Sequence, residues 1–212
     1  MEAEDLASSL PSAECVHCDL TDGDAAVAMA EALAERLEDW RVLVNCAAIF
    51  REDTAQTLDP ALFIEAMQVN AATPVRIAQT FLAKARAQGG RRVIHFTDMK
   101  LANPNPDFFS YTMSKHALAA TVRTLAMAQS RADDRIYGLA PGAILPSFDQ
   151  RAEEHETSGR MNLLQRLTQP DELAEAALFL AEGWLESGET LFVDSGQHLL
   201  AQSRDVLYLA RQ

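Results

Sequence analysis

The sequence has little cysteine and no long apolar run, and both absences narrow the class of protein. Three cysteines among 212 residues are too few for the disulfide framework of a small secreted scaffold. No apolar stretch approaches the ~18 residues that a membrane span needs. The acidic, polar N-terminal stretch is unlike a secretory signal. Free thiols without such a signal predict a cytoplasmic protein that does not associate with membranes.

Basic residues are also scarce. Lysine and arginine together number 18 against 31 aspartates and glutamates, a net charge of −13, and Arg91 and Arg92 form the one adjacent basic pair. A surface of this charge repels phosphate backbones, so we do not expect a nucleic-acid partner. The content of 48% hydrophobic and 23% charged residues is that of an ordinary globular protein. The length suits a single domain.

Two of the three cysteines, Cys15 and Cys18, form a C-x-x-C motif. This spacing occurs in redox pairs and in half zinc sites. We predict that Cys15–Leu20 is a strand, in which side chains three positions apart point to opposite faces and cannot bind one metal. A second C-x-x-C, which would complete a zinc site, is absent from the sequence. The sequence therefore predicts no metal site.

Short apolar segments alternate with helical ones along the chain. Near-continuous apolarity in a short segment favours a strand of a parallel sheet that is covered on both faces. Repeated strand–helix units predict a doubly wound, Rossmann-like α/β fold of three layers with right-handed crossovers. The five predicted strands are Cys15–Leu20, Arg41–Ala47, Arg92–Thr97, Arg135–Leu139 and Thr190–Val193.

The segments between these strands show helical periodicity or helix-start signals. In the longest of them, Asp59 is suited to cap the helix N-terminus with a proline directly after it. Pro74 predicts a kink near 70–73. The polar segment 143–162 is either a substrate lid or a solvated helix without a role, and both remain open. The predicted helices are Asp24–Leu37, Asp59–Ala87, Tyr111–Gln129 and Pro170–Ala181.

Polar or small residues follow the predicted strands, at the edge where doubly wound sheets bind ligands. Small residues there allow a flat ligand to approach the backbone. The four such places are Asp19-Leu20, Asn45-Cys46-Ala47-Ala48, Asp98 and Pro141-Gly142.

Tyr111 and Lys115 form a Y-x-x-x-K motif at the start of a predicted helix. One helical turn apart, their side chains lie on one face. An ammonium beside a phenol lowers the phenol pKa from its ordinary ~10, which makes tyrosine usable as a general acid. The motif alone is common by chance. Here it lies 13 positions after Asp98, and this context favours a catalytic role.

Taken in this order, these residues resemble the short-chain dehydrogenase/reductase family from about Asp19 to Leu199. The resemblance implies that Asp19 and Leu20 contact the adenine of a nicotinamide cofactor. It places Asn45, Cys46 and Ala47 in the N-N-A-G motif and Pro141 and Gly142 beside the nicotinamide. It also implies that Asn70 holds a water of the proton relay, that Tyr111 donates the proton, and that Lys115 contacts the nicotinamide ribose. Val193-Asp194-Ser195-Gly196 matches the family's V-D-G-G.

One departure points to a branch of the family. Asp98 stands where the family usually has serine, Ala48 replaces the last glycine of N-N-A-G, and the chain has D-S-G-Q-H-L at 194–199. These features resemble the pteridine reductase and dihydromonapterin reductase branch. The resemblance implies hydride transfer from NADPH, with NAD as the alternative cofactor, to the C=N or C=O bond of a dihydropterin or similar small molecule. It also implies a homo-oligomer, a dimer or tetramer, associated through the 59–87 and 111–129 helices.

A second departure concerns the N-terminal part of the family pattern. The family begins with a strand, a T-G-x-x-x-G-x-G turn, a helix and a second strand, and Met1 aligns with the helix before its third strand. We therefore expect 1–212 to be a single domain without its first βαβ unit, owing to a misassigned start codon or a truncated product. Such a chain should bind NADPH weakly or not at all, because the glycine turn normally binds the pyrophosphate.

Two rival functions remain open. The chain could reduce an ordinary keto or enoyl substrate, or oxidise an alcohol, with Asp98 only a structural variant. It could also be a truncated pseudoenzyme that survives as an oligomer partner. An in-frame glycine turn encoded upstream of Met1 would favour an enzyme, and a stop codon there would favour the pseudoenzyme.

Overall fold

The computed structural model describes residues 3–129, 131–147 and 149–212. Four strands form: β1 (Val42–Asn45), β2 (Arg92–Phe96), β3 (Arg135–Pro141) and β4 (Thr190–Val193). Each adjacent pair is parallel, and the strand order is β1-β2-β3-β4. Because all four strands run in one direction, the residues that follow them meet along one edge of the sheet.

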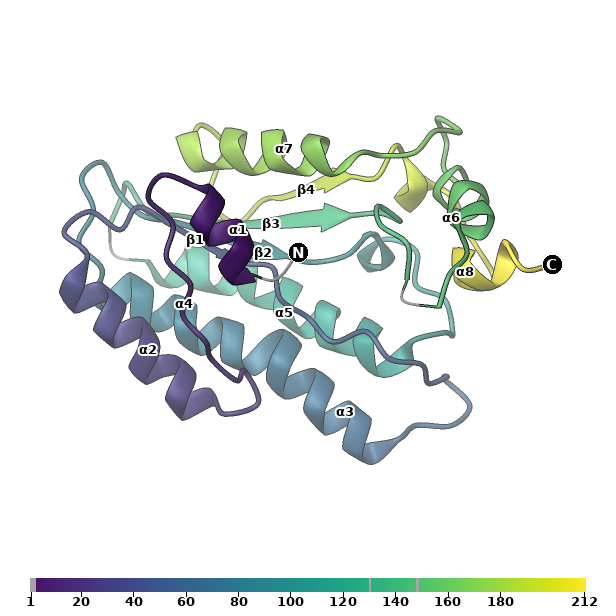
Figure 1. Cartoon of the computed structure of the whole chain (residues 1–212), viewed down its shortest axis with the longest axis horizontal. Helices are drawn as coiled ribbons and strands as arrows, with labels where there is room; N and C mark the ends of the chain where they lie inside the picture. Colours follow the sequence, from purple (N-terminus) through teal and green to yellow (C-terminus); the bar gives the residue numbers. More distant parts are fainter. Residues whose placement is uncertain (1–2, 130, 148) are drawn as a thin grey trace.

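Helices cover both faces of this sheet, which confirms the predicted doubly wound fold (Figure 1). On one face α4 and α5 contact the sheet, α2 packs on α4, and α3 packs on α5; on the other face α7 contacts β2, β3 and β4. The helices are α1 (Ala3–Ser9), α2 (Gly23–Arg36), α3 (Pro60–Met67), α4 (Thr73–Lys84), α5 (Phe109–Ala128), α6 (Ala152–Gly159), α7 (Pro170–Glu182) and α8 (Val206–Leu209), with short turns η1 (Gln68–Ala72), η2 (Met99–Leu101) and η3 (Gln197–Leu199).

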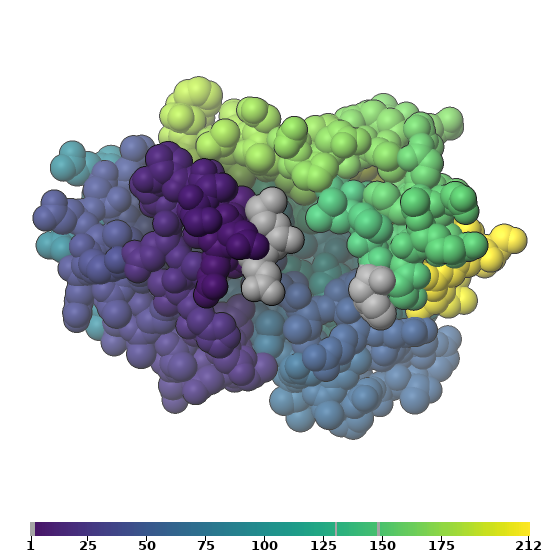
Figure 2. All heavy atoms as spheres, viewed as in Figure 1, coloured from purple at the N-terminus to yellow at the C-terminus, as the bar shows by residue number. Residues whose placement is uncertain are grey.

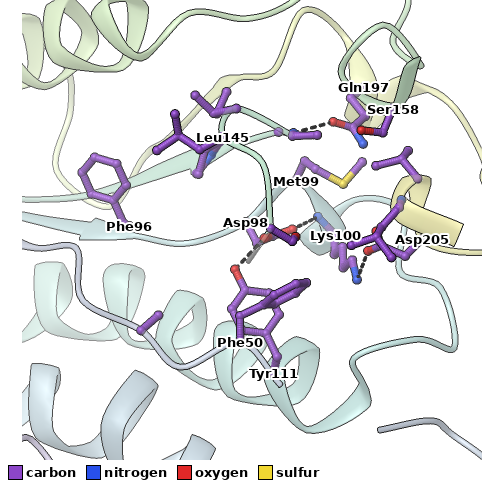
Figure 3. A pocket seen from close by; sticks show the side chains of 18 of the residues that line it. Phe50, Phe96, Asp98, Met99, Lys100, Tyr111, Leu145, Ser158, Gln197 and Asp205 are labelled. Carbon is purple, nitrogen blue, oxygen red and sulfur yellow. Dashed lines mark hydrogen bonds and ion pairs between the residues drawn. The ribbon is translucent and has the colours of Figure 1, made fainter. Parts of the chain in front are cut away.

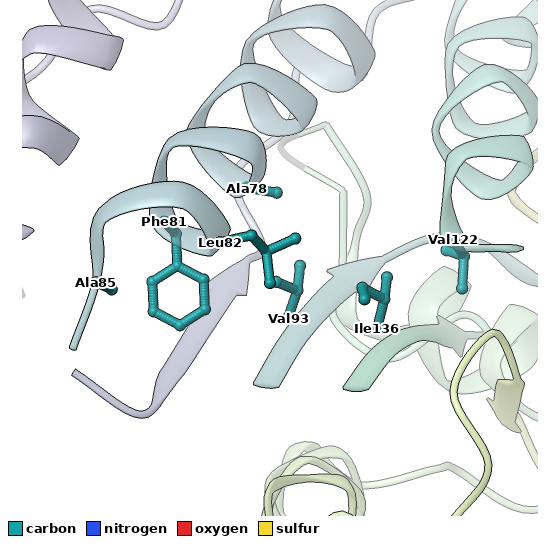
Figure 4. Packing of buried hydrophobic residues seen from close by; sticks show 7 residues of the cluster. All are labelled: Ala78, Phe81, Leu82, Ala85, Val93, Val122 and Ile136. Atoms are coloured by element: carbon teal, nitrogen blue, oxygen red, sulfur yellow. The ribbon is translucent and has the colours of Figure 1, made fainter. Parts of the chain in front are cut away.

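A dense apolar cluster holds α4 and α5 against the middle strands. Figure 4 shows α4 side chains beside Val93 of β2 and Ile136 of β3, with Val122 of α5 next to them. A second cluster holds α7 on the opposite face and is centred on the buried Ile94, Tyr137, Leu139 and Leu180. Alternate residues of β2 thus face the two helical layers, as the near-continuous apolarity of the strand predicted.

The predicted strand Cys15–Leu20 is wrong, because this segment has no regular secondary structure. A strand needs a neighbour to complete its hydrogen bonds, and within the described residues β1 pairs with β2 alone. The segment is held instead by side chains: Cys18 and Leu20 pack on the apolar cluster of α2 and α4. The argument that strand geometry separates the two thiols therefore fails, although both are free.

The predicted long helix 59–87 is interrupted where Pro74 indicated a kink. Asp59 accepts hydrogen bonds from the backbone N–H groups of Ala61 and Leu62 and so caps α3, as predicted. The π-helical turn η1 then separates α3 from α4, and Pro74 lies in the first turn of α4. Part of the polar segment 143–162 forms the short helix α6. In the described part of the chain, no helix is long and apolar enough to span a membrane.

Candidate active site

A cavity of about 550 Å³ lies at the carboxyl edge of the sheet. In the space-filling view, the green residues around α6 and the blue residues around α3 border a hollow with a teal floor (Figure 2). The residues after β1, β2 and β3 all contribute, together with the start of α5, the segment before α6 and the C-terminal segment. The predicted site residues that line it are Cys46, Asp98, Tyr111, Lys115, Pro141 and Gly142.

Asp98 and Tyr111 are directly bonded in this cavity. The Tyr111 hydroxyl donates to Asp98 Oδ2 at 2.7 Å. Lys115 lies one turn along α5, with its ammonium 5.7 Å from the Tyr111 ring centroid and donating to the Phe96 carbonyl oxygen at 2.7 Å. The sequence spacing of Asp98, Tyr111 and Lys115 has therefore brought a carboxyl, a phenol and a buried ammonium together.

The ionisation of these three groups is strongly perturbed. Burial raises the pKa of Asp98, and burial together with the Asp98 carboxylate raises the pKa of Tyr111 well above 10. Burial lowers the pKa of Lys115. The expectation that Lys115 lowers the pKa of Tyr111 is thus not met, because the carboxylate beside the phenol and the loss of water act in the other direction. Perturbation of this kind is typical of functional sites.

Asn70 lies in the π-helical turn and ties the loop after β1 to α5. Its Oδ1 accepts from the Ile49 N–H at 2.8 Å, and its Nδ2 donates to the Ile49 carbonyl at 2.9 Å and to the Ser114 hydroxyl at 3.0 Å. Asn70 is fully buried beside the cavity rather than in its lining. The water relay expected of it remains a prediction.

Asn45 lies in the layer below the cavity. Its Nδ2 donates to the Pro74 carbonyl at 3.2 Å and lies 3.2 Å from His95 Nδ1, which therefore accepts. Burial, with a smaller effect of Lys115, lowers the pKa of His95 to about 4. Asn45 thus positions the end of β1 through a neutral imidazole, and Cys46 rather than Asn45 lines the cavity.

A carboxylate from a distant loop fixes the start of α5. The Ser110 backbone N–H donates to Asp53 Oδ1 at 3.0 Å, and the Ser110 hydroxyl donates to the same carboxylate. Phe108, the residue directly before α5, has a left-handed backbone with φ of 52°, a conformation that non-glycine residues adopt only when their surroundings impose it. Asp53 therefore holds the turn that aims Tyr111 into the cavity, and nothing in the local sequence pattern indicated this contact.

Phe50 forms the aromatic wall of the cavity (Figure 3). Its ring meets Tyr111 edge to face, with centroids 4.8 Å apart, and stacks on Phe108 with centroids 3.9 Å apart. Phe108 is buried behind Phe50, and neither Phe108 nor Phe109 lines the cavity. Phe50 follows directly on the N-C-A-A-I segment, and that position was the available signal.

The Pro141-Gly142 turn is held by a side chain from the segment after β4. Gln197 accepts a hydrogen bond from the Ala143 N–H through Oε1 at 2.9 Å. A Cβ at Gly142 would lie 2.6 Å from that oxygen and 2.8 Å from the Cβ of Asp194, so a larger residue there would force the turn or its support to shift. The D-S-G-Q-H-L segment therefore supports the turn beside the cavity.

Besides Asn45, three predicted cofactor contacts lie outside the cavity lining. Asp19 is exposed, and its carboxylate accepts hydrogen bonds from the Thr21 N–H and hydroxyl. Leu20 accepts a hydrogen bond from the Thr73 hydroxyl through its carbonyl oxygen. Ala47 is exposed on the loop between Cys46 and Ala48, both of which line the cavity. In the described parts of the chain, no cluster of three or more His, Cys, Asp or Glu side chains could hold a metal ion.

The cavity fits the nicotinamide end of the cofactor that the resemblance implies. Small residues, Cys46 and Ala48 on one side and Gly142 and Ala143 on the other, leave the backbone open to a flat ring. Lys115, which lines the cavity, would hold the ribose, and the exposed carboxylate of Asp19 would contact the adenosine group. When bound, the cofactor would supply a hydride.

Comparison with known proteins places this site in a family. Residues 1–198 match the family model described as Enoyl-(Acyl carrier protein) reductase. The chain is 30% identical over 191 residues to 7alpha-hydroxysteroid dehydrogenase of Escherichia coli K12, covering 84% of this chain and 72% of that protein. It is 22% identical over 187 residues to dihydromonapterin reductase of Citrobacter koseri, covering 87% of this chain and 78% of that protein.

A solved structure extends the likeness to three dimensions. FolM Alternative dihydrofolate reductase 1 from Brucella canis, complexed with NADP, superposes with a TM-score of 0.85 at 31% identity and covers 95% of this chain and 81% of its own. The family match covers nearly the whole chain, and the parallel sheet with a cavity at its carboxyl edge is the architecture expected for that family. The chain belongs to the short-chain dehydrogenase/reductase family and is an NAD(P)-dependent oxidoreductase.

Proposed function

We propose that this protein is an NADPH-dependent reductase of dihydropterins. The observation behind the proposal is the hydrogen bond between Tyr111 and Asp98 at 2.7 Å, which puts a carboxyl where most of the family has a serine hydroxyl. The aromatic face of Phe50 beside this pair is suited to a flat bicyclic ring. The likeness to the Brucella FolM structure and to dihydromonapterin reductase supports the same substrate class.

In this proposal Tyr111 and Asp98 supply the proton as a couple. If Tyr111 gave up a proton while Asp98 was ionised, two negative charges would lie within a hydrogen bond of each other, which is unfavourable. The couple therefore delivers its proton from the state in which both groups are protonated, and the remaining proton is shared between carboxyl and phenol. The raised pKa of Asp98 makes that state accessible closer to neutral pH. Lys115 orients the ribose, and Asn70 holds the relay water.

Exchange of Asp98 for serine tests the substrate class. The carboxyl can accept hydrogen bonds from pterin amino groups and can hold a proton, whereas a serine hydroxyl suits a ketone. Loss of a charged hydrogen bond costs about 1.5–3 kcal/mol, or about ten- to a hundredfold in rate. We expect Asp98→Ser to lower kcat/KM for dihydrobiopterin and dihydromonapterin by that factor and to lower the pterin-to-ketone ratio. The measurement compares kcat/KM of the wild type and of Asp98→Ser on pterins and on a ketone panel.

The same experiment addresses the rival substrate. The identity to a hydroxysteroid dehydrogenase favours a keto or alcohol substrate. If the wild type ignores pterins, or if Asp98→Ser leaves the pterin-to-ketone ratio unchanged, the ketone hypothesis replaces the pterin one. Asp149→Ser, in a partly exposed ion pair with Arg211, is the matched control and should leave the ratio unchanged.

We also propose that the protein acts as a homo-oligomer. An apolar groove lies between α3, η1, α4 and α5, lined by Phe63, Met67, Val75 and Ala117, with Ile64 67% exposed. The described surface of these helices thus leaves apolar side chains in water, which favours burial against a second copy. Sedimentation of wild type and Ile64→Glu tests this, since the added charge should shift the protein to a smaller species.

A further inference from the structure

A continuous chain of polar contacts joins the C-terminal segment to the Tyr111 phenol (Figure 3). Tyr111 donates to Asp98 Oδ2, and the other oxygen of that carboxylate accepts from the Lys100 backbone N–H at 2.8 Å. The Lys100 ammonium then pairs with Asp205 Oδ2 at 2.6 Å. Lys100 and Asp205 both line the cavity. Neither was singled out by the sequence, since 105 positions separate them.

The Lys100–Asp205 pair is buried and rigidly held. Lys100 is 5% exposed and Asp205 is 7% exposed. Asp107 accepts from the Asp205 N–H at 2.8 Å and pairs with Arg204 at 2.7 Å, and Asp205 caps the Leu207 N–H at 3.0 Å. These bonds fix the two charges at set positions relative to Asp98, so little solvent reorganisation can screen them.

We propose that Lys100 and Asp205 are a positioning pair for the Asp98–Tyr111 couple. The ammonium favours the ionised form of Asp98, and the Asp205 carboxylate opposes it. Two residues without a bond to the phenol oxygen would therefore set the pH at which the couple releases its proton. The catalytic part of this inference rests on the proposed function; the electrostatic part does not.

The two charges should act with opposite sign. After burial, Lys100 is the first influence on the pKa of Asp98 and lowers it, while Asp205 is among the groups that raise the pKa of Tyr111. The other charged or titratable groups that act on the couple are Lys115 from α5 and Cys46 from the loop after β1. The Asp107–Arg204 pair lies against Asp205. The charge of each of these groups is kept in both variants.

Two variants with opposite predicted effects test the proposal. In the full chain, Lys100→Met should move the titration of the Asp98 carboxyl to higher pH, and Asp205→Asn should move it to lower pH, each by about 0.5–1 unit. Asn is chosen because it can still cap Leu207. The Asp98 titration is followed by carbon NMR without substrate. The limb of the kcat/KM profile that falls with rising pH should move in the same two directions.

Matched controls come from exposed ion pairs between α2 and α4. Lys84→Met removes the partner of Glu31, and Asp24→Asn removes the partner of Arg76. Both should leave the titration of Asp98 unchanged. Lys100→Arg, which keeps the charge, should retain a wild-type titration.

A purely structural role for the pair predicts a different result. Shifts in the same direction for both variants, or no shift in either, would overturn the proposal. If Lys100→Met does not fold, the test rests on Asp205→Asn and Lys100→Arg. The Asp98 carboxyl must then titrate at lower pH in Asp205→Asn and at the wild-type pH in Lys100→Arg. Because the carboxyl titration needs no reaction, opposite shifts in a protein that reduces no dihydropterin would refute the proposed function alone.

Discussion

The amino end of β3 and the carboxyl end of β2 hold two carboxylates in opposite electrostatic situations. At the amino end, Asp134 accepts hydrogen bonds from the Arg91 backbone and guanidinium, which also donates to the Leu82 carbonyl. Burial alone would raise the pKa of Asp134, but these bonds outweigh it and lower the pKa. At the carboxyl end, Asp98 has a phenol rather than a guanidinium as its side-chain partner, and burial raises its pKa.

The opposite pKa shifts of the two carboxyl groups indicate a structural role at one end of the sheet and a chemical role at the other. A carboxylate whose negative charge is matched by a bidentate arginine stays ionised and contributes to the fold. A carboxyl that is desolvated without such a match has a raised pKa and keeps its proton to a higher pH. The amino end should therefore respond to mutation in stability, and the carboxyl end in activity.

The largest loss of activity without loss of stability should come from Tyr111→Phe, because it deletes the proposed proton donor and little else. We expect kcat for dihydropterin reduction to fall by about a hundredfold or more, while NADPH affinity stays within about twofold. Steady-state kinetics and a fluorescence titration with NADPH measure the two. Tyr137→Phe is the control: it removes a buried hydroxyl that donates to the Leu185 carbonyl, so stability should fall by about 1 kcal/mol with activity retained. Near-normal turnover in Tyr111→Phe would contradict the proposed role.

At the opposite end, Asp134→Ala should act on stability alone. Leaving the buried Arg91 without its partner costs about 3–5 kcal/mol, measured by urea unfolding. Because the folded pKa of Asp134 is lowered, its stabilisation should be complete above about pH 4 and lost as the pH falls further. The variant should lack this part of the acid dependence. If Asp134→Ala changed the ratio of kcat/KM for pterins to kcat/KM for ketones while the folded fraction stayed constant, the contrast between the two ends of the sheet would be wrong.

A smaller effect should appear at Asp53, where a mutation should lower both stability and activity. Asp53→Ala removes the acceptor for the Ser110 N–H, which should cost about 0.5–2 kcal/mol of stability. It should also lower kcat several-fold, because α5 then holds Tyr111 less firmly. Asp53→Asn keeps an acceptor and should retain most of both properties. Equal kinetics in wild type and Asp53→Ala would show that the cap is not needed to aim the phenol.

The sequence predicted the parts of this site that depend on short-range spacing. Tyr111 and Lys115 are one helical turn apart, and Asp98 follows shortly after the apolar strand β2, so local structure indicated that the three could lie together. The interruption near residue 70 followed from Pro74 in the same way. Cys15–Leu20 failed because apolarity indicates a buried segment but does not supply a paired neighbour.

Contacts between distant segments could not be predicted from one sequence. Asp205 reaches Lys100 and Asp53 reaches Ser110 only after the chain has folded, and no periodicity relates these residues. Phe50 lies between the two cases: its place after β1 was visible, but its stacking on Phe108 depends on the left-handed turn at that residue.

The π-helical turn at 68–72 has a consequence for how the chain can vary. A π turn holds one residue more than an α turn, and one residue advances the phase of a helix by about 100°. The turn therefore lets α3 face α5 and the apolar groove while α4 faces α2 and β1. Deleting one residue within 68–72 would restore a single phase to both halves and rotate Asn70 away from Ile49 and Ser114. The apolar groove and the site thus both depend on the one extra residue of this turn, and a change in helix register would disturb both at once.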